Sequence, residues 1–163
     1  MKILIGLSLL TLPLSADVSL PAIFGNGMVV QRDAPLRVWG TADPNEAVSI
    51  TFNRMKASGT ANAEGNWLLE IPAQKADGKS HQLEVKGNNT ITLTDVLIGD
   101  LWIGSGQSNM EWNLTQSGRK EEFIKAANHP NIRLFHIPKV RKPAPQTDVN
   151  ASWKTCTSEN IPR

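Results

Sequence analysis

Short runs of apolar and β-branched residues, several of them alternating with polar residues, recur through the first half of the chain, and turn residues separate them. The runs lie at 28–30, 36–40, 48–52, 67–71, 83–85 and 91–93. Alternation with a period of two is typical of strands that bury one face. Because the runs are closely spaced and no helical pattern interrupts them, they predict a β-sandwich domain over residues 17–96.

The apolar positions of these runs are expected to face one common core. The predicted members of this core are Val38, Val48, Ile50, Phe52, Leu83, Val85, Ile91 and Leu93. Trp39 and Trp67 leave two interpretations open. Either ring could serve as a stacking platform for a sugar, or both could pack in the core or at its edge. The second interpretation is favoured, because buried tryptophans supply much core area.

The pattern changes at Val96, where residues 96–103 become almost continuously apolar. Such a run is typical of a strand buried on both faces of an α/β sheet. A glycine- and serine-rich stretch follows, and ligands of open α/β sheets bind beyond the carboxyl ends of strands. Ser108 in this stretch is a candidate nucleophile, which needs a base and oxyanion donors. Alternatively, Ser108 or Asn109 caps a following helix, and residue types alone leave both readings open.

Two blocks of sequence carry a resemblance to a known family. Residues 99–112 read Gly-Asp-Leu-Trp-Ile-Gly-Ser-Gly-Gln-Ser-Asn-Met-Glu-Trp. This block closely resembles the nucleophile block of the sialate O-acetylesterase family, within the SGNH-hydrolase superfamily. Residues 20–32, with Val38-Trp39-Gly40 after them, resemble the small β domain that opens these proteins.

The resemblance implies a mixed fold and an esterase activity. An α/β hydrolase domain of the SGNH type, three-layered and flavodoxin-like, would begin after the β-sandwich. The implied reaction removes O-acetyl groups from sialic acid or other acetylated carbohydrates, with no metal or other cofactor. Ser108 would attack the acetyl carbonyl, and its own N–H would be one oxyanion donor. The further oxyanion or pocket candidates are Gln107, Asn109 and Trp112.

The remaining sequence predicts a helix over 119–127, a buried strand over 132–137 and an extended loop over 138–146. A solvated connector is favoured for this loop over a basic binding patch. Trp153 and Cys156 fall in a stretch predicted to be irregular. Cys156 is expected to serve packing, or to form half of a disulfide whose partner lies elsewhere.

The catalytic base is the element that the sequence lacks. The resemblance implies a His preceded three residues earlier by an Asp, and no Asp-x-x-His occurs in the chain. His81, His129 and His136 are expected to be structural or to face solvent. Residues 97–163 are therefore predicted to be a truncated, N-terminal fragment of the esterase domain, and the chain alone is predicted to be inactive. The alternative is a secreted, non-catalytic carbohydrate- or partner-binding β module with a vestigial hydrolase stub.

The first 16 residues have the pattern of a secretory signal peptide, with Lys2 before an apolar run and Ala16 at the expected cut. The run is too short to span a bilayer as a helix, so a secreted or periplasmic protein is expected. A net charge of +2 gives no reason to expect nucleic acid or an anionic membrane as partner. One cysteine and three scattered histidines exclude a disulfide framework and a Cys-rich zinc module. The expected partner is an acetylated carbohydrate.

Overall fold

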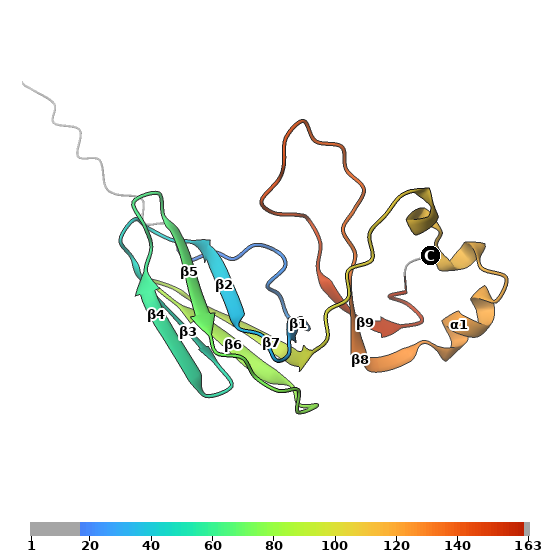
Figure 1. Ribbon diagram of the computed structural model, residues 1–163, viewed down its shortest axis with the longest axis horizontal. Coiled ribbons are helices and arrows are strands. Elements are labelled where there is room, and N and C mark those ends of the chain that lie inside the picture. The colour runs from blue at the N-terminus through green and yellow to red at the C-terminus, as the bar shows by residue number, and fades with distance from the viewer. Residues whose placement is uncertain (1–16, 162–163) are drawn as a thin grey trace, which may run out of the picture.

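The computed structural model describes residues 17–161, which are mostly β-strand with little helix (Figure 1). The signal peptide predicted at residues 1–16 lies outside this range. Within residues 17–161, no helix is long and apolar enough to cross a membrane.

Two sheets make up the first half of the described chain. The larger sheet has the strand order β1 (Val29–Gln31), β7 (Thr90–Gly99), β6 (His81–Lys86), β3 (Ala47–Phe52) and β4 (Met55–Thr60). Its strands are antiparallel except for β1, which runs parallel to β7. The smaller sheet is the antiparallel pair β2 (Leu36–Thr41) and β5 (Asn66–Ile71).

Both sheets contribute to one hydrophobic core, as the alternating pattern predicts. Seven of the eight predicted core residues are buried, and the eighth, Ile91, is partly buried against the same cluster. The two tryptophans differ. Trp67 is buried in the core, whereas Trp39 is 42% exposed.

Strand β4 is a strand that the sequence pattern missed. It pairs with β3 through a two-residue turn in which both Asn53 and Arg54 have positive φ, at 44° and 67°. Turns of this kind match the twist of antiparallel strands. The strand itself reads Met-Lys-Ala-Ser-Gly-Thr, which has little β propensity, so its backbone pairing with β3 decides its conformation.

The strand predicted over residues 96–103 is correct only for its first half. Strand β7 runs through Val96 to Gly99, where it lies between β1 and β6, and therefore continues past the predicted domain boundary at Val96. Leu101, Trp102 and Ile103 are not in a strand, and the two last side chains are at least 90% exposed. Among residues 17–161, no strand pairs with them, which leaves the apolar run uncovered beyond Gly99.

The second half contains short helices and a separate pair of strands (Figure 1). Its elements are the 3-10 helices η1 (Ser108–Glu111) and η2 (Leu114–Gln116), helix α1 (Lys120–Ala126), and strands β8 (Asn128–Phe135) and β9 (Trp153–Thr157). Helix α1 confirms the predicted helix, and residues 138–146 form the predicted extended loop. The irregular stretch predicted around Trp153 is wrong, since it forms β9.

Strand β8 also differs from its prediction. It begins at Asn128, four residues before the predicted start. None of the predicted residues 132–137 is fully buried, and Ile132 and Ile137 are exposed. It pairs with β9, antiparallel, and not with β7. A parallel α/β sheet is therefore not formed within the described range.

Candidate functional site

Ser108 is the first residue of η1, in the loop that follows β7. The N-cap residue of this short helix is Gln107, whose side chain makes no capping hydrogen bond. The alternative in which Ser108 or Asn109 caps a helix is therefore not seen. Ser108 is exposed, as are Gln107, Asn109 and Trp112.

The backbone of the loop leaves donors free beside Ser108. The N–H of Met110 donates to the carbonyl oxygen of Gln107 at 2.9 Å and closes the turn. For the N–H groups of Ser108 and Asn109, no acceptor is found among the residues that the structure describes. N–H groups at the start of a helical turn lack partners within the turn. They therefore remain available to donate hydrogen bonds to an anionic oxygen.

Two glycines shape this loop around the side chain of Met110. A Cβ atom added at Gly106 would lie 2.7 Å from Cγ of Met110, and one added at Gly104 would lie 3.3 Å from its Cε. Real Cβ atoms do not approach other atoms as closely as 2.7 Å, so the Met110 side chain occupies space that only glycine leaves open at position 106. The glycines thus serve close packing within the loop.

Two side chains, those of Gln31 and Arg32, anchor the start of the loop to the end of β1. The Gln31 side-chain oxygen accepts the N–H of Leu101 at 2.9 Å. Arg32 donates to Asp100 at 2.8 Å, and this hydrogen bond holds the pKa of the exposed Asp100 carboxyl below its usual value. Sequence reasoning gave these residues no role, although Gln31 and Arg32 end the β-domain block that carries the resemblance. Gln31 and Arg32 reach the loop because β1 pairs in parallel with β7. The sequence of so short a strand does not reveal this pairing.

The three histidines have no observed link to Ser108 within residues 17–161. His81 lies 3.0 Å from the Asp77 carboxylate and packs edge-to-face on Phe52 in the core. Hydrogen bonding to His81 lowers the pKa of Asp77. His129 and His136 are exposed on or just after β8. These positions agree with the structural and solvent-facing roles that were expected.

Within residues 17–161, neither the cysteine nor a cluster of metal-ligating side chains forms a second candidate site. Cys156 is buried on β9 as a free thiol. Among the residues described, no group of three or more His, Cys, Asp or Glu side chains could hold a metal ion. The exposed loop of Ser108 is therefore the feature that best fits a chemical role, with the serine hydroxyl and the free N–H groups next to it.

Comparisons of sequence and of structure both find acetylesterases among known proteins. No protein-family model matches the chain. It is 28% identical to the human sialate O-acetylesterase and 26% identical to that of Mus musculus, in each case over 151 residues that cover 83% of this chain. A carbohydrate acetylesterase from Xanthomonas citri has a similar structure, with a TM-score of 0.83 and 37% identity over 89% of this chain. The chain spans less than a third of the two curated relatives, 29% and 28%, and 34% of the Xanthomonas citri protein.

Proposed function

The chain is a relative of the sialate O-acetylesterase family, and from this premise we propose that it carries the β-sandwich domain and the nucleophile segment of a carbohydrate O-acetylesterase. The substrate would be sialic acid or another carbohydrate that bears O-acetyl groups. Residues 17–96 would form the β domain, whose last strand β7 continues to Gly99, and residues 97–163 would begin an SGNH-type catalytic domain. Residues 1–16 would direct the protein to the periplasm or out of the cell.

The observation that carries this proposal is the arrangement at Ser108. Its hydroxyl is exposed at the start of η1, and the adjacent N–H groups of Ser108 and Asn109 have no acceptor among the residues described. In the proposed reaction, the Ser108 oxygen attacks the acetyl carbonyl and the sugar oxygen leaves with a proton. Water then hydrolyses the acetyl-enzyme to acetate and free serine. The free N–H groups would stabilise the negative oxygen of each tetrahedral intermediate.

Gln107, Asn109 and Trp112 are proposed to act around the serine. Gln107 precedes η1 and Asn109 follows Ser108 directly, so both can contact a substrate bound at the hydroxyl. The Trp112 side chain is 67% exposed and can form a pocket wall. These roles rest on the resemblance of residues 99–112 to the family's nucleophile block.

We further propose that the 163-residue chain alone has little or no esterase activity. The sequence contains no Asp-x-x-His to supply the base, and no described histidine is linked to Ser108. Removing the base from a serine hydrolase lowers the rate by several orders of magnitude. Four apolar side chains of this segment are exposed, namely Leu101, Trp102, Ile103 and Trp112. Their exposure supports the proposal that the segment packs against further protein. The partner that fits is the part of the relatives that this chain does not match.

A chimera tests the proposal. Residues 17–161 replace the matched third of the Xanthomonas citri carbohydrate acetylesterase, and acetate release from acetylated sugars is measured. We expect the chimera to be active and the chain alone to be at least about a thousandfold slower. Ser108→Ala should remove the activity of the chimera, whereas Ser105→Ala, in the same exposed loop, should retain it. A folded chimera without activity would contradict the proposed function, and an active Ser108→Ala chimera would contradict the role of Ser108.

A further inference from the structure

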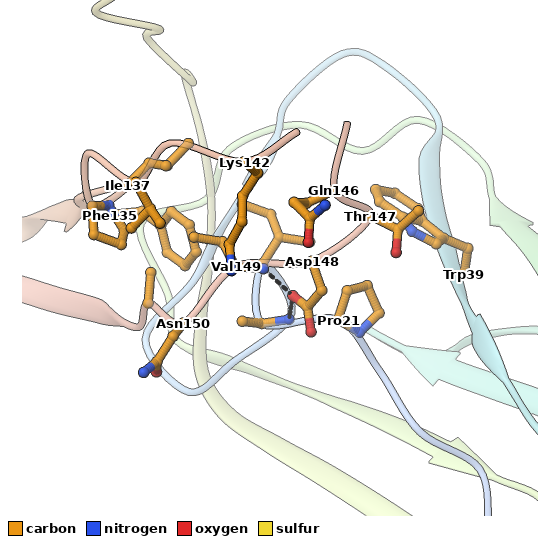
Figure 2. Close-up of a pocket in the computed structure, with 15 residues that line it drawn as sticks. Pro21, Trp39, Phe135, Ile137, Lys142, Gln146, Thr147, Asp148, Val149 and Asn150 are labelled. Carbon is orange, nitrogen blue, oxygen red and sulfur yellow. Dashed lines mark hydrogen bonds between the residues drawn. The ribbon is translucent and has the colours of Figure 1, made fainter. Parts of the chain in front are cut away.

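A groove of about 1010 Å³ lies where the connector between β8 and β9 passes over the start of the β domain (Figure 2). One wall contains Pro21, Ala22 and Ile23, and the opposite wall comes from residues 137–151. None of residues 101–112 lines it, so the groove is separate from the loop of Ser108. Its volume is at the upper end of the range for small-molecule sites, about 300–1,000 Å³.

Hydrogen bonds fix the connector between β8 and β9 to the start of the β domain. The Asp148 carboxylate accepts the N–H of Ala22 at 2.8 Å and that of Val149 at 2.7 Å (Figure 2). The Trp153 indole N–H donates to the carbonyl oxygen of Ile23 at 2.7 Å. Both walls are therefore fixed to each other before any ligand binds, which reduces the entropy that binding would cost.

Trp39 provides an aromatic surface at one end of the groove (Figure 2). Phe24 packs against this ring edge-to-face, with the ring centres 4.7 Å apart, and the tryptophan remains 42% exposed. It lies in β2 opposite Leu68 of β5, on the face of the small sheet that points away from the core. Of the two tryptophans considered from the sequence, only Trp39 can therefore contact a ligand.

Polar groups of the connector lie along the same groove. Gln146, Thr147 and Asn150 are exposed and line it with hydroxyl and carboxamide groups. The Gln146 amide nitrogen donates to the Ala144 carbonyl, which leaves its side-chain oxygen as an acceptor. The charged side chains of the groove are Lys142 and Asp148, one of each sign, so their charges balance. A neutral ligand with many hydroxyl groups complements this combination better than an ion does.

We propose that this groove binds a neutral oligosaccharide. One sugar ring stacks with its C–H face on Trp39, and hydroxyl groups of this and the next sugar bond to Gln146, Thr147 and Asn150. The site would hold a carbohydrate chain independently of the chemistry at Ser108. The exposed tryptophan and the polar connector are far apart in the sequence, and the structure brings them to one site.

The test measures binding of three neutral probes, cellotetraose, xylotetraose and maltotetraose, to the purified chain by calorimetry and by NMR of the tryptophan indole N–H signals. We expect at least one probe to bind and to shift the Trp39 signal. Trp39→Ala should weaken binding by more than about tenfold, and Gln146→Ala, on an exposed connector, should weaken it without affecting the core. Trp102→Ala removes another exposed tryptophan outside this groove and should bind as the wild type does.

Several results would overturn the proposal. They are the absence of binding of all three probes at about 10 mM, unchanged binding by both Trp39→Ala and Gln146→Ala, and preference for the charged probe 3′-sialyllactose over every neutral one. Ser108→Ala should leave binding unchanged, so failure of this site and failure of the proposed esterase function are distinguishable. Circular dichroism of each variant establishes that a loss of binding does not come from unfolding.

Discussion

The buried carboxylate of Glu46 offers a sharp test of how the β domain is held together. Among residues 17–161, Glu46 is the charged residue that is buried, with 8% of its surface exposed. Its two oxygens accept the N–H groups of Asp43, at 2.8 Å, and Asn88, at 2.5 Å. A Cβ atom at Gly87 would lie 2.1 Å from the Glu46 carboxylate, so the chain approaches this side chain as closely as glycine allows. The Glu46 side chain thus joins its own turn to a turn 42 residues further along the chain.

Replacing this side chain removes both hydrogen bonds at once. A hydrogen bond to a charged group contributes about 1.5–3 kcal/mol to stability, and Glu46→Ala loses two of them. Because the smaller side chain lets water reach the two N–H groups, we expect the lower end of the sum, a loss of about 3 kcal/mol in the free energy of unfolding. Glu46→Gln keeps one acceptor oxygen and should lose about half as much.

Urea denaturation, followed by circular dichroism and by tryptophan fluorescence, measures this loss. The control is Glu64→Ala, which removes an exposed glutamate from a turn of the same domain. We expect its stability to stay within about 0.5 kcal/mol of the wild type. If Glu46→Ala is as stable as this control, the two turns do not depend on the carboxylate, which would refute its proposed contribution.

Three further predictions concern other parts of the fold. Gly40→Ala should destabilise the chain by about 1–3 kcal/mol in urea denaturation, because its Cβ would lie 2.0 Å from the Ser19 carbonyl oxygen; wild-type stability would contradict this. The lowered pKa of Asp77 makes its interaction with His81 stabilising above the ordinary Asp pKa of about 3.9, and this contribution is lost as the pH falls through the lowered value. The melting temperature of Asp77→Asn should therefore lie below that of the wild type at pH 7 and approach it near pH 2, and a gap that persists in acid would be inconsistent with this sign. Trp153→Phe loses the indole hydrogen bond from β9 to Ile23 and should speed tryptic cleavage after Lys139 and Arg141; an unchanged cleavage rate would show that this hydrogen bond is dispensable.

The sequence predicts the β domain well because its strands alternate. Alternation identifies which side chains face inward, so residues such as Ile50 and Val85 are found buried where they were expected. Strand β4 lacks this signal, since its small and polar residues gain their conformation from pairing with β3. Local propensity is weak evidence wherever a neighbouring strand decides the outcome.

Around Ser108, the sequence pattern does not predict the burial of side chains correctly. A continuous apolar run predicts burial, but burial needs a neighbouring element, and within residues 17–161 none covers Trp102 or Ile103. The glycine- and serine-rich loop was found from residue types, whereas its anchors, Gln31 and Arg32, depend on a contact across about 70 positions of sequence. The sequence also marked Trp39 and the basic connector as separate features. Only the tertiary structure joins them in one groove.

The central claim, that Ser108 is an esterase nucleophile, is tested most directly by covalent labelling. The active chimera is treated with a fluorophosphonate, which phosphonylates the nucleophilic serine of serine hydrolases, and the labelled peptide is identified by mass spectrometry. We expect one modification, on Ser108, that rises in parallel with the loss of acetate release and is absent from Ser108→Ala. Modification of a different serine, with full loss of activity while Ser108 stays unlabelled, would contradict the claim.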